Sequence, residues 1–266
     1  MGRARDVAGV FDRAAPTYGS AGPDPFGHFG RRLVSMLGTP PGRSVLDVGC
    51  GAGATLVAAA EVAALAVGAD LSHDMLRHAG EALAARRRPA ALVRADAGRL
   101  PFPDGAFDTV TSSFALTYFP APGRTAAELR RVLQPGGRIG ICVSDGWWFQ
   151  GDPEWDWHDE LVHDLGAFLG RRQFSDPAAV ADLLTGAAFG VDRAATEHFP
   201  LRWESADHWW EDGWSHGWRE VLEALSPPAR REYRRRSYER LGDGPVQGRL
   251  EAVLVTATAT ATATAK

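Results

Sequence analysis

Several residue types that mark particular protein classes are scarce in this chain. It has two cysteines among 266 residues, Cys50 and Cys142, and both stand in apolar, strand-like contexts typical of small buried thiols. Two cysteines exclude a disulfide or zinc framework. No charged segment followed by an apolar one opens the sequence, and no run of about 18 apolar residues occurs. We therefore expect a soluble, cytoplasmic protein without a metal site.

Lysine is almost missing as well, since Lys266 is the only one, and the formal net charge is −4. This charge gives no general attraction to a phosphate backbone. Arginines crowd residues 227–241, as they would to bind RNA or a phosphorylated substrate, but they scatter around the predicted helix as on a solvated face. We expect neither a nucleic-acid partner nor insertion into a membrane. The sequence indicates no oligomeric state.

Residues 43–144 alternate short apolar runs with helix-like stretches. This alternation predicts parallel strands joined by crossover helices, and 45% hydrophobic content is enough for a full core. The predicted fold class is α/β, a doubly wound sheet with helices on both faces. The predicted strands of this region are 44–49, 64–70, 90–96, 107–114 and 138–144.

The composition changes on either side of this core. Two predicted helices precede it, and all nine tryptophans lie beyond residue 146. After the core we expect helices near 154–170 and 176–188, a strand near 192–203, two helices across 205–241 and a strand near 249–259. The predicted parts are N-terminal helices (1–42), an α/β core (43–144), a Trp-rich cap insertion (145–175), a core helix and strand (176–203), a helical cap insertion (204–245), and a last strand with a frayed tail (246–266).

The segment VLDVGCGAGA, residues 45–54, carries the first chemical signal. It fits the dinucleotide pattern G-x-G-x-x-A and equally the tighter turn G-x-G-x-G. Its glycines, Gly49, Gly51 and Gly53, let the backbone approach a ligand closely at the carboxyl end of a strand. This feature is common to sites for NAD, FAD and S-adenosylmethionine, and a purely structural turn is the alternative.

Three carboxylates narrow the choice of ligand. Asp70 ends the second strand about twenty residues after the glycines, where it reaches the hydroxyls of an adenosine ribose, and Ser72 is better placed to cap the next helix. Asp96 ends the third strand, where its carboxylate and the N–H of Ala97 suit the edge of an adenine. Asp47 lies where it would repel a pyrophosphate but tolerate a cationic amino-acid tail.

At this point the sequence resembles a known family. The segments 45–53, 68–76, 94–116 and 133–141 resemble the successive motifs of class I S-adenosylmethionine-dependent methyltransferases, in order and at that family's spacing. The segment VFDRAAPTYG, residues 10–19, resembles the N-terminal helix of the subgroup with ubiquinone, menaquinone and small-molecule methyltransferases. The resemblance implies a seven-stranded sheet of order 3-2-1-4-5-7-6 with the last strand antiparallel.

The resemblance also implies roles for single residues. The core (43–144) binds the cofactor, and the N-terminal helices (1–42) cover it. The three loop glycines line the methionine part of the cofactor, and Asp70 holds its ribose. Leu71 and Met75 flank the adenine, whose edge Asp96 and Ala97 read. The carbonyl of Ser113 meets the methionine amine, beside the negative charge of Asp47. Tyr18 closes over the methionine carboxylate, although an aromatic residue after Pro16 also suits simple packing.

The identity of the methyl acceptor is less clearly marked. Enzymes that methylate base amines or glutamine amides carry Asn-Pro-Pro-Tyr after the fourth strand, whereas this chain has SFAL at 113–116. Alignment and exclusion of water can supply most of the catalysis of methyl transfer, and a general base is needed only if the acceptor's proton must leave first. Our candidates for a catalytic or orienting group are His158, at the edge of a predicted buried stripe, and Tyr18. A packed or surface histidine is the alternative for His158.

The tryptophan-rich segment 207–220 presents two stripes if it is one helix. We expect the tryptophan stripe to pack inward and the histidine stripe to face solvent, with both tryptophan-rich segments roofing an aromatic-lined pocket. The stripes are Trp210, Trp214 and Trp218, and His208, Asp212 and His216.

These patterns predict transfer of a methyl group to oxygen or carbon of a small molecule, a specialised metabolite or quinone-like compound. The alternatives are an RNA methyltransferase and a cofactor-binding protein that has lost methyl transfer and acts as a cyclase or regulatory partner.

Overall fold

The computed structural model describes residues 7–144, 156–165, 174 and 176–260. The chain divides into two compact units. The smaller unit comprises Met1–Pro25, Asp145–Arg172 and His198–Glu251, and the larger unit comprises Phe26–Ser144, Gln173–Glu197 and Ala252–Lys266.

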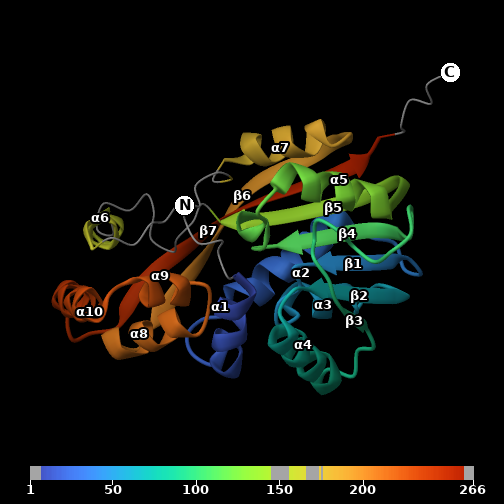
Figure 1. The fold of residues 1–266 in the computed structure, drawn as a ribbon. Helices are drawn as coiled ribbons and strands as arrows, with labels where there is room; N and C mark the ends of the chain where they lie inside the picture. The colour runs from blue at the N-terminus through green and yellow to red at the C-terminus, as the bar shows by residue number, and fades with distance from the viewer. Residues whose placement is uncertain (1–6, 145–155, 166–173, 175, 261–266) are drawn as a thin grey trace. The chain divides into compact units, whose positions relative to one another are not determined.

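The sheet has seven strands in the order β3-β2-β1-β4-β5-β7-β6 (Figure 1). Neighbours from β3 to β5 run parallel, and β7 runs antiparallel to β5. The predicted fold class, strand order and direction of the last strand are confirmed. The strands are β1 (Ser44–Val48), β2 (Leu65–Asp70), β3 (Ala91–Arg94), β4 (Phe107–Ser113), β5 (Leu133–Ser144), β6 (Phe189–Trp203) and β7 (Val246–Ala259).

Helices cover both faces of the sheet in the larger unit. In Figure 1, α5 and α7 lie on one face, and α3 and α4 lie on the other. Helix α2 reaches β5, since a Cβ added at Gly140 would lie 2.8 Å from a methyl of Leu37. The helices of this unit are α2 (Pro25–Leu37), α3 (Ala54–Ala59), α4 (His73–Ala85), α5 (Pro122–Val132) and α7 (Pro177–Gly186), with a 3₁₀ turn η2 (Leu116–Tyr118).

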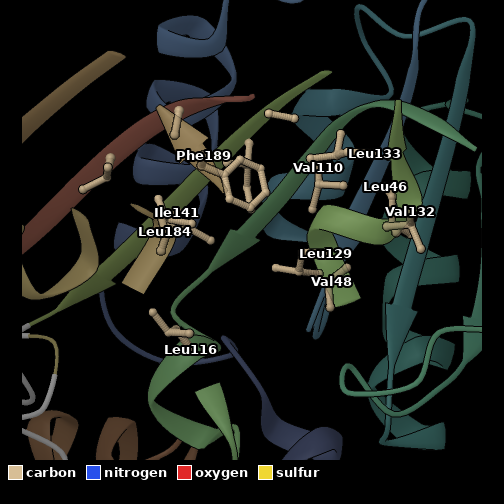
Figure 2. Close-up of a cluster of buried hydrophobic side chains, with 14 of the residues drawn as sticks. Leu46, Val48, Val110, Leu116, Leu129, Val132, Leu133, Ile141, Leu184 and Phe189 are labelled. Carbon is tan, nitrogen blue, oxygen red and sulfur yellow. The ribbon is translucent and has the colours of Figure 1, made fainter. Parts of the chain in front are cut away.

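The core of this unit is continuous across strands and helices (Figure 2), and it consists mostly of aliphatic side chains together with Phe107, Phe174 and Phe189. Leu46 of β1 and Val110 of β4 have no exposed surface, and Ile141 of β5 and Leu184 of α7 are each 1% exposed. Burying one such side chain contributes about 1.5–3 kcal/mol. The strands are therefore held firmly, and their carboxyl ends form a rigid base for the loops that follow.

The smaller unit is mostly helical. Two helices were expected across 205–241, but the structure has three, because the chain turns between Trp214 and Arg219. The helices are α1 (Val7–Ala14), followed by a 3₁₀ turn η1 (Ala15–Thr17), α6 (Asp156–Asp164), α8 (Ala206–Trp214), α9 (Arg219–Ala224) and α10 (Pro227–Leu241).

Polar contacts tie the N-terminal segment into this unit. The Glu223 carboxylate on α9 lies 2.6 Å from Nη2 of Arg13 and 3.0 Å from Nε of Arg219. The N–H of Gly22 donates to Nε2 of His208 at 3.0 Å. No helix among the described residues has the length and hydropathy needed to cross a membrane.

Candidate functional site

The loop between β1 and α3 requires glycine at three positions. Gly49, Gly51 and Gly53 have φ of 69°, 51° and 88°, a region that side chains with a Cβ rarely adopt. A Cβ added at Gly49 would also lie 2.4 Å from the Cβ of Ala115, in the segment after β4. The loop can take this tight path only without side chains.

Asp70, at the end of β2, is hydrogen-bonded to this loop. Its Oδ2 accepts from the N–H of Gly51 at 2.9 Å, and its Oδ1 accepts from the N–H of Ser72 at 2.8 Å. Capping of α4 belongs to Ser72, whose hydroxyl accepts from the N–H of Met75 at 3.1 Å, as the sequence predicted. Asp70 is thus oriented by backbone donors while remaining partly exposed.

Asp47 on β1 is a buried carboxyl with an unfilled hydrogen-bonding position. It is 1% exposed, and its Oδ1 accepts from the Thr111 hydroxyl of β4 at 2.7 Å. Its Oδ2 has no hydrogen-bond partner among the described residues. Burial raises the pKa of Asp47 to about 7, the charge of Asp70 raises it further, and the Thr111 hydroxyl and the Leu56 backbone oppose the rise.

The residues expected around an adenine lie in different environments. Leu71 is 47% exposed, an unusual position for a large apolar side chain, whereas Met75 is buried. Asp96 is exposed, Ala97 is partly buried, and the Oδ1 of Asp96 accepts from the N–H of Gly98 at 2.8 Å. Leu71 and Asp96 follow the paired strands β2 and β3, so one ligand at this edge of the sheet can meet both.

The carbonyl of Ser113 is directed by the hydrogen bond of the next residue. The N–H of Phe114 donates to the Cys142 carbonyl of β5 at 2.7 Å. Across a trans peptide the carbonyl points opposite to the N–H, so the Ser113 carbonyl points away from β5, towards the β1 side of β4. Pairing of β1 with β4 ends at Asp47 and Thr111. The carbonyl therefore faces the region beyond the end of β1.

These groups gather at one point of the sheet, the carboxyl ends of β1 and β4. There the strand order reverses, which is where doubly wound sheets bind ligands. These groups suit a ligand that has an ammonium, a ribose and an adenine. The ammonium suits the buried carboxyl of Asp47 and the outward carbonyl of Ser113, the ribose suits the oriented carboxylate of Asp70, and the adenine suits the exposed side chain of Leu71. The residues fit S-adenosylmethionine. Among the described residues no cluster of three or more His, Cys, Asp or Glu side chains is placed to hold a metal ion.

His158 lies in the smaller unit and is 1% exposed. Its Nε2 is 2.6 Å from the hydroxyl of Tyr233 on α10, and its ring centroid lies 4.8 Å from that of Trp218 and 6.1 Å from that of Trp209. Burial lowers the pKa of His158, so the imidazole is neutral at pH 7. The sequence placed this residue at the edge of a buried stripe. The structure places it inside an aromatic cluster, and its catalytic role stays a prediction.

Tyr18 follows the 3₁₀ turn η1, again in the smaller unit. It is partly buried, and its ring centroid lies 6.4 Å from that of Phe11. This contact suits packing within the N-terminal segment, and the predicted roles of Tyr18 at the cofactor and in catalysis remain predictions.

The expected inward tryptophan stripe was wrong for two of its three residues. Trp218 is buried at 4% exposure, but Trp210 and Trp214 are only partly buried, whereas Asp212 and His216 of the opposite stripe are buried. The Asp212 carboxylate accepts from the indole N–H of Trp203 on β6 at 2.8 Å, and this partner draws the polar side of α8 inward. Trp147, Trp148 and Trp155, expected in the roof of a pocket, lie outside the described residues.

Three further residues shape the site and were not predicted from the sequence. Thr111 fixes Asp47, Ala115 packs against Gly49, and Phe114 directs the peptide after β4. Thr111 was recognisable in principle as a polar residue in an apolar strand. The other two depend on contacts between distant segments.

Comparison with known proteins agrees with this geometry. Residues 46–141 match the family model described as a methyltransferase domain. A nocamycin O-methyltransferase from Saccharothrix syringae is 36% identical over 242 residues, covering 83% of this chain and 85% of that protein. A demethylmenaquinone methyltransferase from Mycolicibacterium paratuberculosis is 40% identical over 144 residues, covering 52% of this chain and 59% of that protein.

A solved structure shares the fold. It is a putative methyltransferase from Bacillus halodurans, with a TM-score of 0.63 and 20% identity over 87% of this chain and 99% of that one. The family match and the long similarity to the nocamycin relative agree with a site built for S-adenosylmethionine. The chain belongs to the class I S-adenosylmethionine-dependent methyltransferases.

Proposed function

We propose that this enzyme methylates an oxygen or carbon atom of a small molecule, a specialised metabolite or quinone-like compound. The observation that carries the proposal is the similarity to an O-methyltransferase over 83% of this chain. The shorter similarity to a quinone methyltransferase supports the same class of acceptor. The SFAL segment after β4, which lacks the Asn-Pro-Pro-Tyr pattern of amine-methylating enzymes, favours oxygen or carbon over nitrogen.

Binding of the cofactor falls to the residues at the switch point. Asp70 would hold the ribose hydroxyls, Leu71 and Asp96 the adenine, and Asp47 with the Ser113 carbonyl the ammonium group. Bound S-adenosylmethionine supplies a methyl group already activated by its sulfonium. The chain therefore needs chiefly to align the acceptor and exclude water.

A general base is required only for an acceptor that must lose a proton. His158 is our candidate for a base or orienting group, and its neutral imidazole has the correct protonation state. Its contact with Tyr233 would have to open before an acceptor could reach Nε2. His158→Ala should then lower turnover more than cofactor affinity, and unchanged turnover would remove His158 from the site.

The segments 145–175 and 204–245 are proposed, on sequence grounds, to cover the acceptor. Quenching of tryptophan fluorescence when acceptor is added to the cofactor complex would support this role. We also propose that the enzyme acts in the cytoplasm and without nucleic acid.

Mass spectrometry can test the proposed acceptor class. Cell extract is incubated with enzyme and cofactor carrying an isotopically labelled methyl group, with the Asp70→Ala variant as the control. Label in small molecules that the variant does not produce would support the proposal. Label in RNA would contradict it, and cofactor binding without any labelled product would favour a non-methylating role.

A further inference from the structure

Phe114 has a backbone conformation that phenylalanine rarely adopts. Its φ is 55°, in the left-handed region, where a bulky side chain is strained. Among the described residues other than glycine, only Arg87 and Ala188 share a positive φ. Phe114 is the one of the three that directly follows β4 at the switch point. Such strain persists where surrounding contacts hold it in place.

Two aromatic residues of α2 supply contacts to its ring. The ring centroid of Phe114 lies 5.1 Å from that of Phe26, with the planes at 81°, and 5.8 Å from that of Phe29, with the planes at 61°. Both arrangements are of the edge-to-face type that aromatic pairs favour. Phe29 has no exposed surface, so it is a firm support. The hydrogen bond from the Phe114 N–H to the Cys142 carbonyl fixes the other side of the residue.

The turn at Phe114 shapes the site through the residue that follows it. The hydrogen bond from the Phe114 N–H to β5 sets the direction of the Ser113 carbonyl whatever φ Phe114 adopts, but the path of the chain beyond Phe114 depends on that φ. The left-handed turn brings Ala115 against Gly49, where a Cβ added at Gly49 would lie 2.4 Å from the Cβ of Ala115. An extended residue at position 114 would continue the strand and carry Ala115 away from the glycine loop.

We propose that Phe114 is a positioning residue of the cofactor site. Its packing against Phe26 and Phe29 holds a left-handed backbone that keeps Ala115 against Gly49. Resting on the proposed cofactor site, this contact holds the glycine loop in the path that lines the methionine part of S-adenosylmethionine. The ring acts through the backbone and contacts no reacting atom. Cofactor affinity thus depends on an aromatic cluster of α2 and the segment after β4.

Two substitutions at position 114 separate backbone conformation from the ring. In Phe114→Ala a positive φ still costs free energy, but the ring contacts that hold it are gone, so the backbone should relax to a negative φ. Phe114→Gly loses the same contacts, yet glycine adopts positive φ without that cost. We expect S-adenosylhomocysteine, measured by calorimetry, to bind about tenfold more weakly to the alanine variant and within about threefold of wild type to the glycine variant. Equal weakening, or a weaker glycine variant, would overturn the proposal.

Phe26→Ala provides a second test that leaves position 114 intact. It should weaken binding in the wild-type background but add no further loss to Phe114→Gly, because glycine no longer depends on the ring contact. Additive losses would contradict the mechanism. This cycle remains informative if Phe114→Ala does not fold, and melting temperatures of all variants without ligand serve as the control.

Discussion

Replacing Asp47 with asparagine should stabilise the protein without cofactor at neutral and alkaline pH. Burial raises the pKa of this carboxyl from 3.8 to about 7. Below pH 4 the folded and unfolded states both hold the proton, and Asp47 costs nothing. Between pH 4 and 7 the unfolded state loses the proton while the folded state keeps it, so stability falls by about 1.4 kcal/mol per pH unit. Above pH 7 the full cost is on the order of 4 kcal/mol.

Asparagine can still accept from the Thr111 hydroxyl but cannot ionise. The free energy of unfolding in urea should therefore be similar for the two proteins near pH 4 and higher for Asp47→Asn by a few kcal/mol at pH 8. Protonation of His158 destabilises the fold as pH falls below 6.5, but it does so in both proteins and cancels in the difference. Asp243→Asn, at an exposed position, is the matched control. Parallel stability curves from pH 4 to 8 would refute the reasoning.

The protonation state of Asp47 should change when the cofactor binds. A cationic ligand beside Asp47 favours its ionised form, so binding near pH 7 should release a fraction of a proton. Calorimetry in buffers of different ionisation enthalpy measures that fraction. Asp47→Asn should lose this release, and its affinity should fall most above pH 7. Equal proton release by the two proteins would assign the effect to another group.

Three further substitutions test the site and its supports. Asp70→Ala should weaken cofactor binding, measured by calorimetry, by about 1.5–3 kcal/mol. The control Glu81→Ala, on the exposed surface of α4, should leave binding unchanged. Normal binding by a folded Asp70→Ala variant would contradict the assignment of Asp70 to the ribose. Gly49→Ala should lower the melting temperature much more than Gly42→Ala does. Both glycines have a positive φ, but only a Cβ at position 49 would meet another side chain, that of Ala115. Equal losses would show that the contact with Ala115 is unimportant. Tyr233→Phe should lower stability by about 1 kcal/mol, because it removes the hydrogen bond between two buried side chains, Tyr233 and His158; no loss on urea unfolding would show that this hydrogen bond is weak.

Local patterns predicted much of the larger unit because its strands and caps follow short-range rules. The alternation of apolar runs located all five core strands, and Ser72 caps α4 as expected. The start of β5 was placed five residues late, since Gly136 has a positive φ and the pairing of β4 with β5 shifts register between Phe107 and Thr109. A register shift of this kind leaves no periodic pattern of apolar residues in the sequence. The complete strand order came from the resemblance to a family.

The smaller unit was harder to predict because its buried groups choose distant partners. A helical wheel predicts that Asp212 faces solvent. Its burial is favourable because its carboxylate accepts a hydrogen bond from the indole N–H of Trp203, which lies on β6. His158 was assigned to an edge, and its partner Tyr233 lies 75 residues away. Periodicity measures the average polarity of a helix face, whereas these hydrogen bonds make burial favourable for single polar residues that would otherwise face solvent.

The position of Asp47 illustrates why a binding site can oppose stability. A buried carboxyl with one unpartnered oxygen, close enough to Asp70 to feel its charge, is unfavourable in the protein alone. A leucine or threonine at that position would remove this cost, but neither would offer an anion to a cationic ligand. If Asp47 binds the ammonium group as we propose, the positive charge of S-adenosylmethionine would offset the burial of its carboxylate, and the unfavourable energy of the free site would become part of the preference for a charged ligand. On our proposal the strained backbone at Phe114 follows the same principle, because its conformation is costly for folding and useful only in holding Ala115 against the glycine loop that meets the ligand.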